Sequence, residues 1–337
     1  MLNQKEINLF NNGDRIDHYF FISKSEIKKT RNNDEYIFFE FADKKSSINA
    51  NLWKDKKEFE QLKELYLKGN LTGRIIKVQG EIREFNNNLS INIESIRLAV
   101  DDDKITIKDF MKTSERSIRE MKDEFKRWIN NIGNDYLKKL LQKVFDDETL
   151  NRFAEHPAGK IWHHSYIGGL IEHTLEIISI CDLISKFHKE INRDLLITGA
   201  MLHDVGKIIE ISADPGFEYS TEGKLIGHIV IAVMMVEKEI NRIKDFPDDL
   251  RTNLLHLLLS HQGKLEQASP VVPKTIEAIA LYHADELSAK TNAYKLTLER
   301  ELKSPSGWTK YINLAGTELY YQNSQTNFTI EKETLFD

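Results

Sequence analysis

The first hundred residues alternate between apolar and polar positions in short runs, a pattern typical of β strands. The last of these runs, 89–98, alternates strictly and follows a polar turn at 86–88. A helix is predicted over about 56–68, between the third and fourth strands. Five strands with a helix in this place indicate an OB-like barrel, although another strand meander would give the same order. The predicted strands cover residues 19–24, 36–42, 47–53, 74–82 and 89–98.

After the acidic run 101–103, the spacing of apolar residues changes to the three or four residues of amphipathic helices. Met121, Phe125 and Trp128 keep this spacing in a helix that opens at Ser114. The sequence therefore predicts a multidomain β plus all-α chain, a small barrel followed by a larger all-helical domain. Further helices are predicted at about 134–145, 148–155, 166–187, 193–202, 226–241, 248–260, 273–290 and 293–301. The predicted division is an N-terminal extension (1–13), a barrel domain (14–100), a linker (101–113), a helical domain (114–321) and a C-terminal tail (322–337).

The composition fits two globular domains in a reducing compartment. The chain has 337 residues, of which 40% are hydrophobic and 30% charged, enough to bury two cores. A single cysteine, Cys181, excludes an internal disulfide framework. The longest apolar run, 226–236, is too short to span a membrane, and the first residues show no signal-peptide pattern. We therefore expect a soluble, cytoplasmic protein with no membrane partner.

Charge and histidine content differ between the two predicted domains. The chain has a net charge of −6, but residues 14–100 hold 16 Lys and Arg against 14 Asp and Glu. The acidic excess therefore belongs to the helical half, and the net charge does not exclude a nucleic-acid partner. Ten of the 11 histidines follow residue 150, so candidate chemistry is concentrated in the helical half.

Several of these histidines interrupt helical stretches that are otherwise apolar. One buried His is usually a satisfied core residue, but an imidazole in so apolar a helix needs a hydrogen-bond partner or a metal. His203 and Asp204 end one such helix, and we expect Gly206 to relax the turn so that both side chains converge. Five helices each offering one or two such ligands suit a divalent transition metal inside a bundle. In chain order the candidates are His173, His203, Asp204, His228, His261 and Asp285.

Four strings surround these residues: HHSYIGGLIEH at 163–173, LHDVGK at 202–207, EGKLIGH at 222–228 and SHQGK at 260–264. The order His, His-Asp, His, His, Asp resembles the HD superfamily of metal-dependent phosphohydrolases and phosphodiesterases. With an OB-like barrel ahead of it, the chain is similar to the YhaM-type 3′-to-5′ exoribonucleases. This resemblance covers about 14–321.

The resemblance implies a ligand set for two metal ions. His173, His203, Asp204 and Asp285 would hold one ion, and a second ion, shared through Asp204, would add the two ligands His228 and His261. Such sites often carry another His directly after the one at 261, where this chain has Gln262. An amide oxygen is the poorer ligand, so the second ion is expected to be weakly held or missing. Mn²⁺ is the expected metal, with Zn²⁺, Co²⁺, Fe²⁺ and Mg²⁺ as alternatives.

The chemistry expected of such a site is attack by a metal-activated water on phosphorus. Asp204 would orient the water, and Lys207 would contact a phosphate, the alternative for Lys207 being a solvated position at the helix end. His164, like His163, would contact the scissile phosphate or the leaving group, and a packing or capping role is the alternative for both.

Aromatic and basic residues are interleaved along the predicted barrel strands. OB folds bind single strands by stacking bases on aromatic side chains within a basic groove. Because strand side chains alternate, about half of these aromatic residues must fill the barrel core. The residues predicted to contact nucleic acid are Tyr36, Trp53, Lys54 and Lys77.

We therefore expect a metal-dependent 3′-to-5′ exoribonuclease that acts on single-stranded RNA, with single-stranded DNA as a further candidate substrate. The resemblance also implies a homo-oligomer. One alternative is an HD phosphohydrolase of small nucleotides whose barrel is a regulatory or assembly module. The other is a nucleic-acid-binding protein without catalysis.

Overall fold

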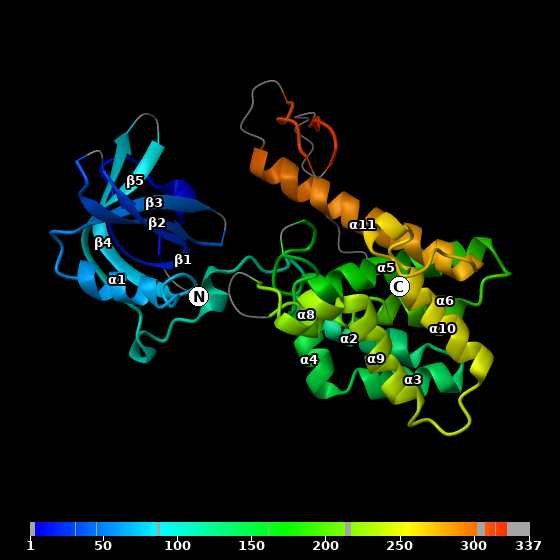
Figure 1. Cartoon of the computed structure of the whole chain (residues 1–337). Helices are drawn as coiled ribbons and strands as arrows, with labels where there is room; N and C mark the ends of the chain where they lie inside the picture. Colours follow the sequence, from blue (N-terminus) through cyan, green and yellow to red (C-terminus); the bar gives the residue numbers. More distant parts are fainter. Residues whose placement is uncertain are drawn as a thin grey trace.

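Strands occupy the first part of the described chain and helices the second, as Figure 1 shows. The computed structural model describes residues 4–30, 32–44, 46–85, 88–160, 162–212, 217–301, 307–313 and 315–321. The predicted tail 322–337 lies outside the described residues. Within the described residues, no helix combines the length and the apolar character that a membrane span requires.

The N-terminal part is a closed barrel with the strand order β1-β2-β3-β5-β4. β3 and β5 pair in parallel, and the other neighbouring strands pair antiparallel. Helix α1 lies between β3 and β4 in the chain, so the predicted OB-like barrel is confirmed. The elements are β1 (Arg15–Lys29), β2 (Glu35–Ala42), β3 (Ser47–Trp53), α1 (Phe59–Leu67), β4 (Ile75–Phe85) and β5 (Asn88–Leu98).

Side-chain alternation divides the aromatic residues of β2 between the core and the surface. Ile37, Phe39 and Phe41 are fully buried in the barrel. Tyr36 and Phe38 point to the opposite side of the strand and are partly exposed. The alternation rule thus separates the core residues from those that could meet a ligand.

The segment before β1 is part of the barrel and not a free extension. Ile7 and Phe10 are buried in the same apolar cluster as the strands. The backbone N–H of Ile7 also donates to Asp43 Oδ2 at 2.6 Å. Sequence periodicity missed this packing because the segment forms only a short 3₁₀ turn, Ile7–Leu9. The other domain boundaries drawn from the sequence stay predictions.

The helical part is built around α6 (Arg193–Leu202), in which every residue from 195 to 202 is buried. Because this helix is apolar on all sides, its neighbours enclose it, and its C-terminal end carries the His-Asp pair inside the domain. The all-helical domain expected after the barrel is therefore confirmed. The other helices are α2 (Ile118–Asn130), α3 (Asp135–Val144), α4 (Asp147–Glu155), α5 (Gly169–Phe187), α7 (Lys207–Glu210), α8 (Thr221–Ile226), α9 (His228–Ile240), α10 (Asp248–Ser260) and α11 (Ile276–Glu301).

The two helices predicted at 273–290 and 293–301 are one continuous helix, α11, so the predicted break is wrong. The segment contains no Gly or Pro, and the side chain of Asn292 is held by tertiary contacts. Its Oδ1 accepts from the backbone N–H of His164 at 2.7 Å, and its Nδ2 donates to the Tyr166 hydroxyl at 3.2 Å. A polar residue that falls in the predicted gap is therefore satisfied inside the helix.

Gly206 has a different role from the one predicted. Its φ of −64° lies in the ordinary helical region, so the turn does not need a glycine for its backbone conformation. A Cβ at this position would instead lie 2.1 Å from the carbonyl oxygen of His228 and 2.8 Å from the backbone nitrogen of Ala232. Glycine therefore allows α9 to approach the His-Asp turn closely.

Replacing Gly206 with alanine should push α9 away from the His-Asp turn. We expect Gly206→Ala to lower stability by about 1–3 kcal/mol, the usual cost of overpacking, as measured by urea unfolding. Gly159→Ala is the matched control, because a Cβ there meets its nearest neighbour, the His163 carbonyl oxygen, at an ordinary 3.5 Å. Equal stability of the two variants would contradict the close-approach role.

Candidate metal centre and nucleic-acid groove

The carboxylate of Asp204 lies between four imidazoles that come from four different parts of the helical domain. Its Oδ2 is 3.2 Å from His203 Nε2 and 3.9 Å from His173 Nε2. Its Oδ1 is 3.5 Å from His228 Nε2 and 3.8 Å from His261 Nε2. One carboxylate thus faces two pairs of histidines, one pair on each oxygen.

Asp285 and Lys207 complete the charged groups around this carboxylate. Asp285, on α11, places Oδ1 3.0 Å from His173 Nε2. Lys207, at the start of α7, places Nζ 2.6 Å from Asp204 Oδ2 and is 7% exposed. His283, which shares the helix with Asp285, is exposed. The structure therefore brings together all six predicted ligands and Lys207.

The outer nitrogen of each of the four imidazoles has a hydrogen-bond partner of its own. With Nδ1 engaged as the donor, the lone pair of Nε2 is directed toward Asp204. Two partners are backbone carbonyl oxygens one helical turn earlier, and two are side chains. The partners are the Ala200 carbonyl for His203 (2.8 Å), the Leu258 carbonyl for His261 (2.8 Å), Glu210 Oε1 for His228 (3.0 Å) and Ser288 Oγ for His173 (2.9 Å).

Several inward-facing atoms of this cluster are buried and have no hydrogen-bond partner among the described residues. They are Nε2 of His173, His203 and His228, and Oδ1 of Asp204. Buried polar atoms are normally paired, because leaving them unpaired costs free energy. Imidazole nitrogens and a carboxylate suit a divalent transition metal, and the two triads His173–His203–Asp204 and Asp204–His228–His261 each keep their ligand atoms within 4.8 Å. The residues therefore fit a metal ion.

The electrostatics keep this ligand set close to the protonation state that a metal requires. Burial alone would raise the pKa of Asp204, but His203 and Lys207 beside it hold this pKa well below its usual range. Burial lowers the pKa of His261 to about 4 and places that of His173 well below its usual value, so both imidazoles are neutral at pH 7. For His203, burial lowers the pKa but Asp204 outweighs it and raises the value, so a bound cation would displace a proton there.

A cavity of about 220 Å³ opens beside the cluster. Lys207, His261 and Asp285 line it, and so does Gln262, whose Nε2 lies 3.4 Å from His261 Nε2. Gln262 therefore stands beside the second triad, and whether that triad holds an ion stays a prediction.

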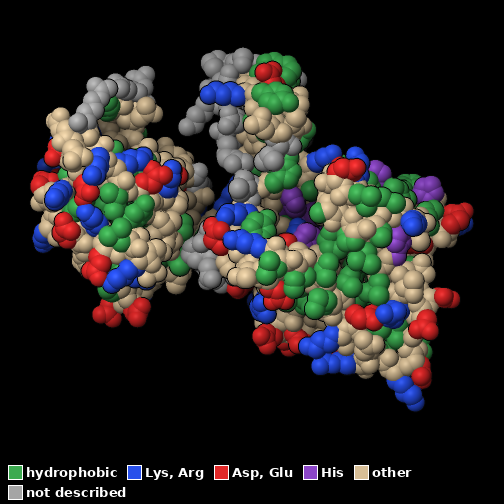
Figure 2. All heavy atoms as spheres, viewed as in Figure 1, with side chains coloured by type: hydrophobic (Ala, Val, Ile, Leu, Met, Phe, Trp, Pro, Cys, Tyr) green, Lys and Arg blue, Asp and Glu red, His purple; other side chains and the backbone are tan. Residues whose placement is uncertain are grey.

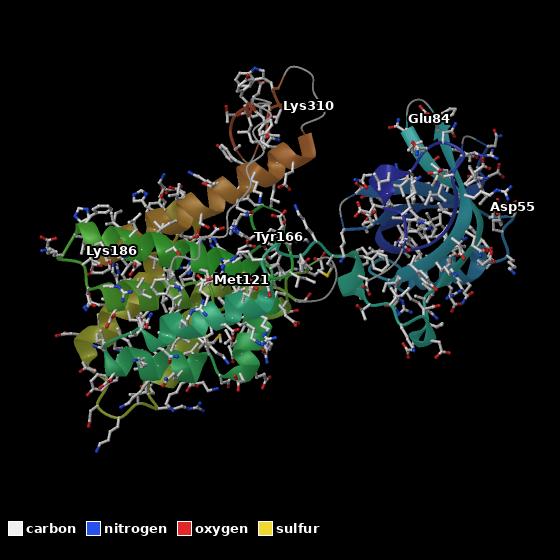
Figure 3. The ribbon with its side chains drawn as sticks, turned by 180° about the vertical axis from the view of Figure 1, so that it is seen from behind. Asp55, Glu84, Met121, Tyr166, Lys186 and Lys310 are labelled. Atoms are coloured by element: carbon white, nitrogen blue, oxygen red, sulfur yellow. The ribbon has the colours of Figure 1, made fainter. Side chains whose placement is uncertain are left out.

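The two histidines before α5 differ in their access to this cavity. His163 lines the cavity, together with Trp162. His164, which was predicted to act in catalysis with Asp204 and Lys207, is fully buried, and its Nε2 lies 3.4 Å from Glu176 Oε2. The structure therefore favours His163 for contact with a substrate. Figure 3 labels Tyr166, which follows His164 by two residues and marks this segment of the helical domain.

A second cavity, a groove of about 550 Å³, lies on the barrel across β2, β3 and the end of the β4–β5 hairpin. Tyr36 and Trp53 lie side by side in it, with ring centroids 4.9 Å apart, and Phe85 at its edge is 75% exposed. Figure 3 labels Glu84, which marks the hairpin end that borders the groove. This is the face on which OB folds bind oligonucleotides.

The two predicted lysines are not among the residues that line this groove. Lys54 follows Trp53 and is exposed. Lys77 lies on β4, where Nζ is 3.1 Å from Asp17 Oδ1 and 5.2 Å from the centre of the Tyr19 ring. Figure 2 shows Lys, Arg, Asp and Glu intermingled on the visible face of the barrel, in keeping with its nearly balanced charge.

Sequence reasoning missed several groove residues. Asn49 and Asn51 line the groove from β3, on the same side of the strand as Trp53, and Asn92 lines it from β5. The alternation of apolar and polar residues in 47–53 could have identified Asn49 and Asn51, because it places them on the same side of the strand as Trp53. To predict Asn92 and Phe85, one would need to know that β3 pairs with β5 and how long the β4–β5 hairpin is. Sequence periodicity gives neither.

Comparisons with known proteins agree with both halves of the structure. The HD domain family matches residues 170–290, which contain all six candidate ligands, and the OB-fold nucleic acid binding domain family matches residues 23–99. A protein of Geobacillus sp. (strain WCH70) named 3'-5' exoribonuclease YhaM is 29% identical over 310 residues, 92% of this chain and 92% of its own. The chain is a homologue of the YhaM exoribonucleases.

Two further YhaM proteins share this full-length similarity. The YhaM of Bacillus subtilis (strain 168) is 28% identical over 318 residues, and that of Bacillus licheniformis is 29% identical over 321 residues. Each match covers 94% of this chain and 98% of the relative. The barrel and the helical domain of this YhaM homologue therefore correspond together, in the same order, to the relatives.

If the Asp204 cluster holds a metal, divalent cations should stabilise the YhaM homologue. At Mn²⁺ about 100 times above its Kd, the stabilisation should be about 2.7 kcal/mol, or roughly 5–10 °C in Tm for a domain of this size. The Asp204→Asn variant should lose this shift, whereas His283→Ala, which removes an exposed histidine two residues from Asp285, should keep it. A Tm that Mn²⁺ raises equally in all three proteins would contradict the site.

Proposed function

We propose that the chain is a metal-dependent 3′-to-5′ exoribonuclease that holds single-stranded RNA in the barrel groove and hydrolyses it at the Asp204 cluster. The observation that carries this proposal is the set of buried Nε2 and Oδ atoms without partners beside an open cavity, in a chain that also contains an OB groove. Relatives that match nearly the whole chain are named 3'-5' exoribonucleases, which supports the same activity here.

The ligand geometry supports a hydrolytic reaction at phosphorus. A divalent cation held by His173, His203, Asp204 and Asp285 would supply an acidified water and offset charge on the phosphate oxygens. His228 and His261 would hold a second cation through Oδ1 of Asp204. Mn²⁺ is the metal we propose on the family resemblance, and because imidazole ligands also suit Zn²⁺ and Fe²⁺ these ions are to be compared with it.

Two residues of the chain would act directly on the substrate. Lys207 lines the cavity with its ammonium 2.6 Å from Asp204 Oδ2. Burial would lower its pKa, but Asp204 raises it, so Lys207 stays charged and can bind a non-bridging phosphate oxygen. His163 lines the same cavity and is placed to meet the leaving group. We propose these two residues for phosphate contact.

The barrel groove supports binding of a single strand without a strong sequence preference. Tyr36, Trp53 and Phe85 offer aromatic faces on which bases can stack, and stacking tolerates every base. The amides of Asn49 and Asn51 can accept and donate hydrogen bonds beside them. Since the barrel carries little net charge, stacking would contribute more to binding than phosphate attraction.

Three finer points belong to the same proposal. We propose RNA as the substrate, with single-stranded DNA as a second substrate to be compared directly. The lone cysteine supports a cytoplasmic location. The homo-oligomer implied by the family resemblance stays a prediction, which sedimentation of the purified protein would measure.

The activity is tested with purified protein, Mn²⁺ and 5′-labelled single-stranded RNA. We expect a ladder of products shortened from the 3′ end, and no ladder with His203→Ala/Asp204→Ala, because both triads lose their shared carboxylate. Hydrolysis of mononucleotides with intact RNA would contradict the proposal in favour of the small-nucleotide phosphohydrolase. RNA binding without turnover in any divalent metal would favour the non-catalytic alternative.

The groove is tested separately by RNA binding in the presence of a chelator. Trp53→Ala should weaken binding by about 1–3 kcal/mol, the usual contribution of one stacked base, as measured by fluorescence anisotropy. Lys77→Ala is the matched control on the same barrel, and it should change the affinity less than about twofold, since Lys77 pairs with Asp17 outside the groove. A larger loss in Lys77→Ala than in Trp53→Ala would place the RNA on the opposite face.

A further inference from the structure

Both nitrogens of the His173 imidazole face one turn of helix α11. Asp285 Oδ1 lies 3.0 Å from its Nε2, and Ser288 Oγ lies 2.9 Å from its Nδ1. Asp285 and Ser288 are three residues apart and therefore share one face of the helix. Both are buried, as is His173 itself, which is fully inaccessible to solvent.

The hydroxyl of Ser288 continues to a carboxylate on the neighbouring helix. Ser288 Oγ donates to Glu176 Oε2 at 2.5 Å. Its proton is thus directed away from His173, and its lone pairs accept the Nδ1–H of the imidazole. Glu176 follows His173 by three residues on α5, so two residues of α5 and two of α11 form one connected set.

This chain of hydrogen bonds has a definite direction, from His173 Nδ1–H to Ser288 and from Ser288 to Glu176. It fixes the tautomer in which Nε2 carries the free lone pair. It also stops rotation of the ring, because a turn about the Cβ–Cγ bond would break the contact at 2.9 Å. A ligand imidazole with its outer N–H bonded in this way is more basic and better oriented.

The exposure of Glu176 gives a reason why the Ser288 hydroxyl lies between the Glu176 carboxylate and the His173 imidazole. The side chain of Glu176 is 40% exposed, whereas Ser288 is 4% exposed. A carboxylate that took the place of Ser288 at Nδ1 of His173 would be buried and lose its hydration, which is costly. Ser288 allows the charge to stay at the surface while it still polarises a ring in the core.

The Nδ1 partners of the other three histidines in the cluster differ from that of His173. His203 and His261 donate to backbone carbonyl oxygens of their own helical turns, which no side-chain substitution removes. His228 donates directly to Glu210, which is 9% exposed. Only for His173, among these four, does the connection pass through a second side chain, so its orientation depends on the docking of α11 against α5.

From these contacts we infer that Ser288 and Glu176 are positioning residues for His173, and that the hydroxyl–carboxylate pair sets the metal affinity of the Asp204 cluster. The inference rests on the metal site of the proposed function but not on the identity of the substrate. Neither residue touches the cavity, since neither is among those that line it. Their effect on a bound metal would therefore pass through His173, although Glu176 Oε2 also lies 3.4 Å from Nε2 of the buried His164.

The test is a Mn²⁺ titration of the full-length protein by calorimetry, with free Mn²⁺ followed by electron paramagnetic resonance. Ser288→Ala and Glu176→Gln should each weaken Mn²⁺ binding by about 10–100-fold, the range typical of such outer partners. Ser288→Thr keeps the hydroxyl and should restore the affinity to within a few fold of the native protein. Ser179→Ala is the matched control, because it removes a hydroxyl from α5 that bonds only the Leu175 carbonyl.

The double variant Ser288→Ala/Glu176→Gln shows whether the two residues act together on His173 or act independently of one another. If Glu176 acts through Ser288, the double variant should bind Mn²⁺ no more weakly than Ser288→Ala alone. Native affinity in Ser288→Ala, or a Ser288→Thr variant as weak as Ser288→Ala, would overturn the inference. The titration contains no RNA, so its outcome does not depend on exoribonuclease activity. If the variants bind Mn²⁺ more weakly but the native protein does not degrade RNA in the separate activity assay, the inference is supported and the exoribonuclease proposal fails.

Discussion

The structure of the helical domain depends on one buried carboxylate. Asp204 is 1% exposed and lies within 4 Å of four imidazole nitrogens and one ammonium. A carboxylate so deeply buried is costly unless positive charge compensates it. Lys207 supplies one such charge, and a bound cation would supply more. The ends of α6 and α10, the start of α9 and the second turn of α5 all meet at this point. The packing of these helices therefore sets the geometry of the ligands.

Close packing is what makes this meeting possible. The wholly buried helix α6 carries the His-Asp pair into the interior, and Gly206 allows α9 to approach it. Each ligand is then oriented by a second contact, to a backbone carbonyl oxygen or to a side chain. Loss of such a contact would leave the fold intact but misalign a ligand nitrogen. Metal affinity therefore reports on these orienting contacts more directly than the stability of the fold does.

The sequence predicted the order of strands and helix in the barrel, and it singled out the six candidate ligands that the structure brings together, because both depend on local patterns. Alternation separated Phe39 from Tyr36, and histidines in apolar helices stood out against their neighbours. The continuity of α11, the role of Gly206 and the packing of Ile7 were not predictable in this way, since each depends on a contact with a distant segment. The same reason explains why Ser288, Glu176 and Phe85 were missed and why Lys77 was placed with the groove. The net charge of −6 did not decide the substrate, because the barrel itself is almost balanced.

The barrel and the metal centre divide the work of the proposed enzyme, and the centre is the part on which catalysis depends. The most direct test is anomalous diffraction from crystals soaked in Mn²⁺. The account predicts a peak within bonding distance of Asp204 and of Nε2 of His173 and His203, with Lys207 moved from its 2.6 Å contact or sharing the carboxylate. A peak bound elsewhere, or an Asp204 that keeps only Lys207 as its partner at saturating Mn²⁺, would contradict it.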